Sequence, residues 1–416
     1  MKDMMIVEGG VPLEGAVNIS PSKNSVLPLM AATLLTQESV TLRPVPDLSD
    51  VRKMVMLLES TGQRIRWEKE TMTLTCGDHC HPETDQASTR AMRASFLVLG
   101  PLVARFRRAC VSFPGGCEIG ERPVDLHLKG LMALGAQINC RHGLIEASCE
   151  KLTGNVIYLD FPSVGGTENI MMAASLARGE TIIINAAKEP EIVDLAGMIN
   201  AMGGRVSGAG SDTIRIVGVR ALHGTTWQPI ADRIEAGTFM LAAATTRGDV
   251  TVRGVQPLHL RPVMAKLREA GALVEEHSDS VRVCAREGTR AVDIHTMPWP
   301  GFPTDLQAPI MVMNAVSAGH SVITETVFEN RFLHVPELNR MGAQIKVKGR
   351  SAFVKGVDQL FSAPVEAPDL RAGAALVIAA MSAEGVSQIT GAMHIGRGYE
   401  GITAKFMGLG AKIREV

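Results

Sequence analysis

The sequence predicts an α/β protein of two domains, built from six repeats of about 70 residues each. Three observations predict this architecture. The chain has 416 residues, which suggests two or three domains at roughly 100–200 residues per domain. A short glycine signature occurs six times at nearly even spacing. The segments between signatures repeat the same order of apolar and alternating patterns, so we expect three repeats in each of two domains.

The signature consists of a glycine, a small residue, any residue and an aliphatic residue. Its copies begin at Gly62, Gly135, Gly203, Gly271, Gly342 and Gly410, and Gln63 takes the small position in the first copy. Successive glycines are 73, 68, 68, 71 and 68 residues apart. Because glycine adopts the left-handed conformation that ends many helices, we expect a helix to precede each signature.

Each repeat begins with a segment rich in Ala, Leu and Met that is apolar on nearly all sides, which predicts a buried helix. These helices are expected at 26–35, 95–103, 169–177, 237–244, 307–318 and 374–383. Short alternating strands are expected next, as at 39–42, 181–184, 250–252 and 322–324. Amphipathic helices then lead to the glycine, as at 195–202 and 263–270, and strands such as 205–207 and 213–217 close the repeat.

Two proline-containing segments, 20–22 and 228–230, mark where the chain is expected to cross between domains. One domain then comprises residues 23–229 and carries the Cys117 loop. The other comprises residues 1–22 together with 230–416. Residues 4–7 are the one strand-like piece near the N-terminus, and we expect this strand to complete a sheet of the C-terminal domain.

The composition excludes several classes of protein. Lys and Arg total 42 against 43 Asp and Glu, a net charge of −1, which argues against a nucleic-acid partner. No apolar run approaches the ~20 residues of a membrane span, and the N-terminal segment is too short and too charged for a signal peptide. Seven cysteines in a long chain indicate reduced thiols. We therefore expect a cytoplasmic protein without a membrane partner.

Five charged residues occupy equivalent places in their repeats. Lys23, Arg93, Arg233, Asp305 and Arg371 precede their signature glycines by 37 to 42 residues, at the start of a buried helix. A helix N-terminus presents free N–H groups and the positive end of the helix dipole. Added cations favour a multiply anionic ligand, so the sequence predicts a cleft for a phosphorylated substrate. For any single residue, an ordinary surface charge is the alternative.

A loop at 113–127 is rich in glycine and proline and places Cys117 five positions before Arg122. A thiol in an exposed, electropositive loop is activated as a proton donor or nucleophile. For the loop alone, a turn with an incidental thiol is the alternative interpretation.

This loop resembles the active-site loop of the UDP-N-acetylglucosamine enolpyruvyl transferases, and the resemblance extends from Val11 to Ile413. Further matching motifs lie at 22–24, 89–95, 163–169, 189–194, 232–238, 302–305, 325–331, 369–372 and 394–400. The resemblance implies two inside-out α/β barrel domains with the active site in the cleft between them. It implies no cofactor and no metal, and phosphoenolpyruvate and UDP-N-acetylglucosamine as small-molecule substrates. The oligomeric state stays open.

The implied reaction transfers the enolpyruvyl group of phosphoenolpyruvate to the 3′-hydroxyl of UDP-N-acetylglucosamine and releases phosphate, the first committed step of peptidoglycan synthesis. Addition followed by elimination needs cations around the donor, an acid for the methylene carbon and a base for the hydroxyl. Two alternatives stay open. One is the sister enzyme 3-phosphoshikimate 1-carboxyvinyltransferase, which lacks the Cys117 loop. The other is a catalytically silent paralogue that binds UDP-sugars.

The resemblance also assigns roles to single residues. The implied catalytic residues are Cys117 as general acid, also able to form a phospholactoyl adduct, Asp305 as base or as orienter of the substrate, Lys23 and Arg397. The residues implied for phosphoenolpyruvate are Lys23, Asn24, Arg93, Arg122, Arg371 and Arg397. Those implied for UDP-N-acetylglucosamine are Asn24, Arg93, Arg122, Pro123, Val124, Asp125, Leu126, Ser163, Val164, Gly165, Asp305 and Val327. Glu329 and Arg331 are expected to form a supporting ion pair.

Two positions depart from the common family pattern. Pro21 and Ser22 precede Lys23 where Gly-Ala is frequent, and Gly166 replaces an alanine. Neither change removes a reacting group, and Ser22 is a candidate cap for the first buried helix. Because Cys117 occupies the thiol position, the sequence also predicts sensitivity to the epoxide antibiotic fosfomycin.

Two further patterns are weighed and set aside. Cys76, His79, Cys80 and His81 are possible zinc ligands, but no second Cys/His pair follows at a suitable spacing, so no metal site is expected. The glycine pairs 9–10 and 203–204 form no phosphate-binding fingerprint. Adenine nucleotides and nicotinamide cofactors are therefore not expected.

Overall fold

The computed structural model describes residues 3–85, 92–113 and 124–416, and the side chain of Arg93 is not part of that description. The chain divides into two compact units. The N-terminal unit lies within residues 21–230, and the C-terminal unit joins the first 20 residues to Ala231–Val416. Each unit has its own cluster of buried apolar residues, so each has a separate core.

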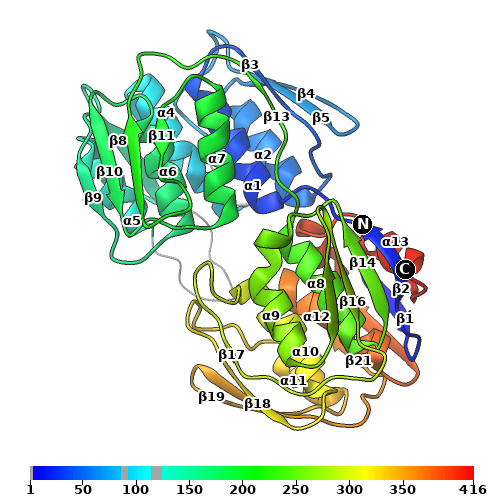
Figure 1. Cartoon of the computed structure of the whole chain (residues 1–416). Coiled ribbons are helices and arrows are strands. Elements are labelled where there is room, and N and C mark those ends of the chain that lie inside the picture. The colour runs from blue at the N-terminus through cyan, green and yellow to red at the C-terminus, as the bar shows by residue number, and fades with distance from the viewer. Residues whose placement is uncertain (1–2, 86–91, 114–123) are drawn as a thin grey trace. The chain divides into compact units, whose positions relative to one another are not determined.

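The N-terminal unit follows the predicted order of helices and strands (Figure 1). Its helices are α1 (Lys23–Ala32), η1 (Thr33–Leu35), α2 (Ser49–Ser60), η2 (Arg93–Val98), α4 (Leu99–Phe106), α5 (Asp125–Ala133), α6 (Val164–Ala174) and α7 (Pro190–Ala201). Its strands are β3 (Ser39–Leu42), β4 (Arg64–Glu68), β5 (Thr71–Thr75), β6 (Arg108–Ser112), β7 (Gln137–Arg141), β8 (Leu144–Ser148), β9 (Val156–Tyr158), β10 (Glu180–Ile184), β11 (Val206–Ser207), β12 (Thr213–Val217) and β13 (Thr226–Trp227).

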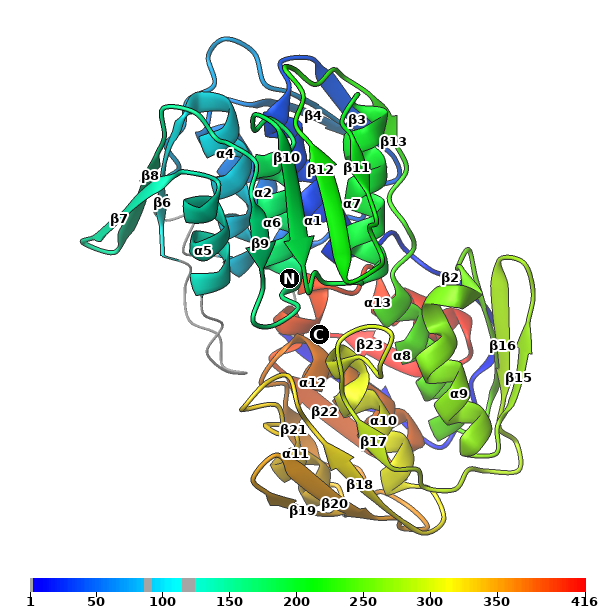
Figure 2. The ribbon, with the colours of Figure 1, turned by 60° about the vertical axis from the view of Figure 1, so that its left-hand side comes forward.

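The strands of this unit form three separate sheets, in the orders β13-β3-β5-β4, β6-β8-β7 and β11-β12-β10-β9. Two of these sheets combine antiparallel pairs with one parallel pair, β13 with β3 and β9 with β10. Figure 2 shows the sheet of β9–β12 on the outside of the unit, with α6 behind it. The buried helices, such as α1 and α6, therefore form the interior, and the sheets lie outside them.

The C-terminal unit repeats this plan. Its helices are α8 (Arg233–Thr245), η3 (Pro257–Leu260), α9 (Arg261–Glu269), η4 (Thr304–Leu306), α10 (Gln307–Ala315), α11 (Val335–Arg340), α12 (Leu370–Ser382), η5 (Ala392–Arg397) and α13 (Ile402–Gly408). Its strands are β1 (Met4–Glu8), β2 (Glu14–Asn18), β14 (Asp249–Arg253), β15 (Leu273–Glu276), β16 (Ser280–Cys284), β17 (Ile294–His295), β18 (His320–Thr324), β19 (Gln344–Lys348), β20 (Ser351–Lys355), β21 (Pro364–Glu366), β22 (Val386–Thr390) and β23 (Lys412–Glu415).

Three sheets surround the helices of this unit, in the orders β21-β22-β1-β23, β15-β16-β14-β2 and β17-β18-β20-β19. Strand β1 pairs with β22 and β23, which confirms the prediction that the N-terminal strand completes a sheet of the C-terminal half. Strand β2 pairs in parallel with β14 and was not predicted. Its residues are mostly exposed, with only Val17 buried, so they show no apolar alternation.

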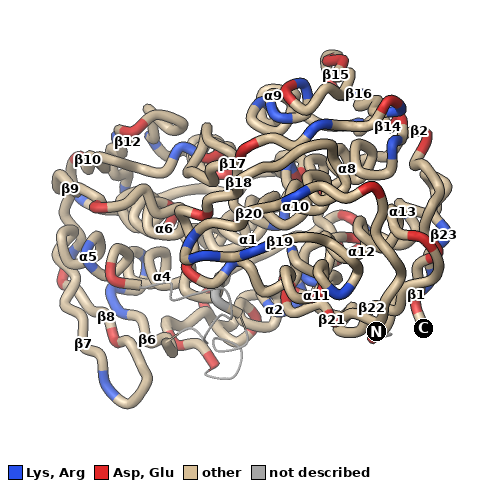
Figure 3. Tube along the Cα trace, turned by 90° about the horizontal axis from the view of Figure 1, so that it is seen from below, with Lys and Arg blue, Asp and Glu red and all other residues tan. Residues whose placement is uncertain are grey.

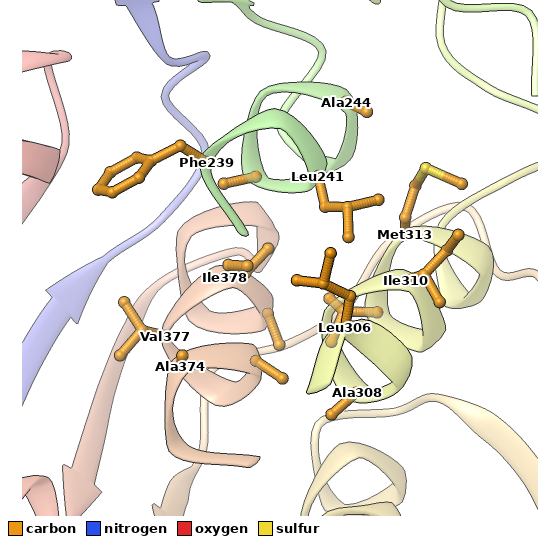
Figure 4. Packing of buried hydrophobic residues seen from close by; sticks show 14 of the residues in the cluster. Phe239, Leu241, Ala244, Leu306, Ala308, Ile310, Met313, Ala374, Val377 and Ile378 are labelled. Atoms are coloured by element: carbon orange, nitrogen blue, oxygen red, sulfur yellow. The ribbon is translucent and has the colours of Figure 1, made fainter. Parts of the chain in front are cut away.

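Helices α8, α10 and α12 form the core of the C-terminal unit. Figure 4 shows Leu241 of α8 and Leu306, directly before α10, pointing toward each other beside Ile378 of α12, and all three residues are fully buried. The six predicted buried helices are all present: α1, α6, α8 and α12 begin three to five residues earlier than predicted, α10 begins at the predicted residue, and α4 begins four residues later, directly after η2. The early starts of α1 and α8 contain charged or polar residues, which lack the apolar signal.

All six signature glycines have the expected left-handed conformation, with φ between 85° at Gly62 and 98° at Gly135. Each follows the C-terminus of a helix, so the helix-stop interpretation is confirmed. Acidic and basic residues alternate along both units in Figure 3, so neither unit carries a single sign of charge. Within the described parts of the chain, no helix combines the length and the apolar character needed to cross a membrane.

Candidate active-site residues in the two units

A buried cluster of opposite charges lies where helices of the C-terminal unit begin. Asp305, in η4, accepts a hydrogen bond from Arg331 Nη2 at 2.6 Å and another from Arg371 Nη2 at 3.1 Å. The two arginine side chains are 5% exposed, whereas that of Asp305 is 25% exposed. The Asp305 carboxylate is therefore partly exposed, while the guanidinium groups of two buried arginines bind it.

Arg371 is fixed on several sides but keeps an unused donor. Its guanidinium lies 5.2 Å from the centre of the Tyr399 ring, and the Tyr399 hydroxyl lies 2.9 Å from Thr238 Oγ1 of α8. Burial alone would lower the pKa of Arg371, but Asp305, Tyr399 and Asp232 together raise it above its usual range. Nη1 is buried without a hydrogen-bond partner. This permanent cation with a free N–H group is suited to binding an anion.

Aspartates cap the two helices beside this cluster. Asp232 Oδ1 accepts the backbone N–H groups of Ile234 and Glu235 at 2.8 and 2.9 Å, at the start of α8. Asp369 Oδ1 does the same for Arg371 and Ala372 at 2.7 and 2.9 Å, at the start of α12. The Asp369 cap fixes the backbone from which Arg371 projects, and the Asp232 cap fixes the start of α8. The sequence analysis did not assign them a role, although an Asp directly before an apolar helix is a readable signal.

The remaining predicted residues of this unit lie nearby in sequence but differ in environment. Arg397 is the last residue of η5 and is half-buried. The Val327 N–H donates to Glu325 Oε1 at 2.8 Å, so only its carbonyl stays open to a ligand. The expected ion pair between Glu329 and Arg331 is not what the structure shows. Glu329 instead lies 3.0 Å from Arg350 at the surface, because Arg331 is buried against Asp305.

In the N-terminal unit, Lys23 is the first residue of α1 and points to Asp50 in the first turn of α2. Lys23 Nζ lies 3.1 Å from Asp50 Oδ2, and the side chains are 10% and 4% exposed. Asn24 follows and is half-buried. The expected cap by Ser22 is wrong, since the Ser22 side chain makes no cap hydrogen bond and its buried Oγ has no partner.

Two segments implied for nucleotide-sugar binding meet in this unit. Val124, Asp125 and Leu126 form the start of α5, and Ser163, Val164 and Gly165 form the start of α6. A Cβ atom on Gly165 would lie only 3.0 Å from the His127 ring, so glycine permits this close approach. Ser163 Oγ caps α6 by accepting the Gly166 N–H at 3.2 Å. Two helix N-termini are thus held side by side.

A group of acidic side chains is buried near the starts of α6 and α7. Burial raises the pKa of Glu168 well above its ordinary value, and the neighbouring Glu191 and Glu189 raise it further. Asp194 in α7 also has a pKa raised by burial. The sequence analysis recognised these positions as family motifs and gave them no role.

Four predicted site residues cannot be placed. Cys117, Arg122 and Pro123 lie outside the described residues, and so does the side chain of Arg93, whose backbone begins η2. Cys76 and Cys80, the discarded zinc candidates, are buried. Among the described residues, no three His, Cys, Asp or Glu side chains gather as metal ligands. The structure thus places Lys23 and 163–165 in one unit and Asp305, Arg371 and Arg397 in the other.

The fold is that of the enolpyruvyl transferases. The enolpyruvyl transferase NikO from Streptomyces tendae superimposes with a TM-score of 0.90 at 23% sequence identity, covering 99% of this chain and 98% of that one. EPSP synthase from Acinetobacter baumannii superimposes with a TM-score of 0.74 at 19% identity, covering the full length of both chains. A model of the family described as EPSP synthase (3-phosphoshikimate 1-carboxyvinyltransferase) matches residues 7–406.

Curated relatives show which family of enolpyruvyl transferases this chain belongs to. UDP-N-acetylglucosamine 1-carboxyvinyltransferase 2 of Carboxydothermus hydrogenoformans is 53% identical over 100% of this chain and 99% of its own length. UDP-N-acetylglucosamine 1-carboxyvinyltransferase 1 of Caldanaerobacter subterraneus is 53% identical over 99% of both chains. The chain therefore belongs to the UDP-N-acetylglucosamine 1-carboxyvinyltransferase family of transferases.

Proposed function

We propose that this protein transfers the enolpyruvyl group of phosphoenolpyruvate to the 3′-hydroxyl of UDP-N-acetylglucosamine and releases phosphate, the first committed step of peptidoglycan synthesis. The observation that carries the proposal is the 53% identity, over essentially the whole chain, to relatives named for this transfer. The cytoplasmic location and the exclusively small-molecule partners expected from the sequence belong to the same proposal.

The reaction proceeds by addition and elimination. Cys117 donates a proton to the methylene carbon of phosphoenolpyruvate while the sugar hydroxyl oxygen attacks the adjacent carbon. Loss of phosphate and of a methyl proton from the tetrahedral intermediate then restores the double bond on the transferred group. Negative charge accumulates on the phosphate and carboxylate, so fixed cations stabilise this path.

Asp305 is the base that accepts the hydroxyl proton. Its two arginine partners favour the ionised carboxylate, which is the form that a base requires, and its partial exposure leaves it within reach of a ligand. The same two contacts also suit an orienting role, in which Asp305 holds the hydroxyl without taking its proton. The two roles differ in their effect on kcat.

In this proposal the cationic Lys and Arg side chains bind phosphoenolpyruvate, the anionic donor of the enolpyruvyl group. Arg371 offers the unpartnered Nη1 to the phosphoenolpyruvate carboxylate or phosphate, and Lys23 offers a buried ammonium at the start of α1. Arg93, Arg122 and Arg397 complete this set in the proposal, with Asn24 beside Lys23. The paired helix starts at 124–126 and 163–165 serve the nucleotide sugar, together with Pro123 and Val327.

Phosphate release from phosphoenolpyruvate tests the proposal, with UDP-N-acetylglucosamine or shikimate 3-phosphate as acceptor. The expected result is release with the nucleotide sugar alone and near-complete loss in Cys117→Ala. Release with shikimate 3-phosphate would transfer the assignment to the sister activity. Silence with both acceptors, combined with measurable binding of UDP-N-acetylglucosamine, would favour the UDP-sugar-binding paralogue.

A further inference from the structure

Asp194 gathers three hydrogen bonds from separate parts of the N-terminal unit. Its Oδ1 accepts the indole N–H of Trp227 at 2.9 Å. Its Oδ2 accepts the backbone N–H of Ile230 at 3.2 Å and also the hydroxyl of Ser25. Asp194 itself lies on α7 and is 5% exposed. Both carboxylate oxygens are therefore committed to the protein, which leaves no role in direct substrate binding.

Two of these three bonds converge on the start of α1. Ser25 lies in the first turn of α1, directly after Lys23 and Asn24. Ile230 accepts the backbone N–H of Ser22 at 2.7 Å, so its position fixes the residue before the helix. Since the side chain of Ser22 makes no cap bond, the first turn of α1 depends on neighbouring elements for its orientation.

The surroundings of Asp194 suit a carboxylate that accepts several hydrogen bonds from the protein. The pKa of Asp194 is raised above its ordinary value, chiefly by burial; the hydrogen bonds from Ser25, Trp227 and Ile230 oppose this rise, and Glu191 adds to it. Three donors converge on two oxygens, a demand that an ionised carboxylate meets fully and a neutral amide does not. Replacing Asp194 by Asn presents an N–H₂ group to at least one of these donors.

We infer that Asp194 is a positioning residue for enolpyruvyl transfer: through Ser25 and Ile230 it fixes the first turn of α1 and thereby the active-site residues Lys23 and Asn24. The inference rests on the proposed function, because it gives Lys23 and Asn24 their role in binding phosphoenolpyruvate and the sugar. Outer groups that orient binding residues are commonly worth 10- to 100-fold in activity.

Three single variants separate the bonds. Asp194→Asn keeps one acceptor oxygen and breaks at least one of the three bonds, Ser25→Ala removes only the bond to α1, and Trp227→Phe removes only the indole bond. We expect kcat/KM for phosphoenolpyruvate to fall about 10- to 100-fold in Asp194→Asn, mainly through KM, and about 3- to 10-fold in Ser25→Ala. Trp227→Phe, the matched control, keeps wild-type kinetics because the bonds to Ser25 and Ile230 remain.

The double variant Ser25→Ala with Asp194→Asn tests whether the two residues act together. Its loss in kcat/KM is expected to be smaller than the product of the two single losses, since both substitutions weaken the same network of bonds. Thermal unfolding of every variant sets the assay temperature well below each Tm, and Ser25→Ala, which loses one hydroxyl, keeps the test valid if Asp194→Asn fails to fold.

The outcomes are distinct. Wild-type kinetics in Ser25→Ala, or equal kinetic losses in Trp227→Phe and Ser25→Ala, would overturn the positioning role and leave Asp194 as a structural anchor. A wild-type enzyme that releases no phosphate with UDP-N-acetylglucosamine would instead overturn the proposed function, and this inference with it.

Discussion

Lys23 and Asp50 form a buried ion pair between the first residue of α1 and the first turn of α2, with Nζ and Oδ2 3.1 Å apart. A buried ammonium group without a counter-charge loses its proton or destabilises the fold. Asp50 therefore allows Lys23 to stay charged at a helix N-terminus, where the helix dipole also attracts anions. The counter-charge of Lys23, which we propose binds the anionic substrate, is thus a residue that the sequence analysis did not identify.

Replacing Asp50 by Asn is expected to lower the free energy of unfolding by about 3–5 kcal/mol, because it removes the counter-charge that lies 3.1 Å from the buried Lys23 ammonium. Urea denaturation measures this loss. Arg52→Gln is the matched control on the same helix, since it breaks the exposed pair with Asp47 at 2.6 Å and should cost at most about 1 kcal/mol. Equal losses in the two variants would contradict a buried, energetically important pair.

The role of Asp305 is separable by kinetics. As a base it contributes roughly 10²- to 10⁴-fold, so Asp305→Asn should lower kcat by that factor with a smaller change in KM. The hydrogen bond from Arg331 can persist to the amide oxygen, which limits the structural disturbance. Steady-state assays with both substrates varied provide the measurement. A raised KM for UDP-N-acetylglucosamine with kcat retained would assign Asp305 to orientation only.

Fosfomycin is expected to inactivate the enzyme by alkylation of Cys117. Mass spectrometry of the treated protein should find one added equivalent, on the peptide that contains this residue. Cys110 and Cys149 serve as internal controls, because burial raises the pKa of both thiols and so lowers their thiolate fraction. Full turnover in excess fosfomycin with Cys117 unmodified would refute the prediction.

The repeats made the fold readable from the sequence. Six glycines with positive φ and six buried helices follow directly from spacing and apolar content. Strand β2 was missed because only Val17 of its five residues is buried, and its existence depends on pairing with β14 more than 230 positions away in sequence. Local pattern carries no information about such a pairing.

For the charged cluster of Asp305, Arg331 and Arg371, the sequence likewise indicated single residues but not the contacts between them. Arg371 and Asp305 were found because each begins a buried helix, but their contact joins positions 66 residues apart. The choice of Asp305 over Glu329 as the partner of Arg331 depends on burial, which the sequence pattern of 325–331 does not encode. Ser22 shows that a favourable residue type is not sufficient: it precedes α1, but its side chain makes no capping hydrogen bond.

The buried Glu235 is expected to make the free energy of unfolding depend on pH. It is buried in α8, where Oε1 binds Lys405 Nζ at 2.6 Å and Oε2 accepts the Ser20 N–H at 2.7 Å. Burial raises the pKa of Glu235 from 4.5 to about 7, against the opposing effect of Lys405. Between these two values the folded protein holds a proton that the unfolded chain has lost. The stability contributed by this proton is therefore complete below pH 4.5 and disappears as the pH rises through 7.

Glu235→Gln should remove that dependence. The stability of the wild type relative to the variant is expected to fall by about 3 kcal/mol between the lower and upper pKa values. Chemical denaturation at several pH values across this window measures the difference. The same substitution at the exposed Glu269 should leave the pH profile unchanged. Parallel profiles for wild type and Glu235→Gln would show that Glu235 does not titrate in this range.

The signature glycines can be tested by a pair of identical substitutions. A Cβ atom added at Gly271 meets nothing within 4 Å, but its φ is +95°, so the cost of Gly271→Ala is purely conformational. We expect a loss of about 1–2 kcal/mol in the free energy of unfolding. Gly408, the last residue of α13, also has open space around it and no positive φ, so Gly408→Ala should stabilise the protein by roughly 0.4–1 kcal/mol. Thermal unfolding should therefore shift in opposite directions for the two variants. A shift in the same direction would mean that the signature glycine is not selected for its backbone conformation.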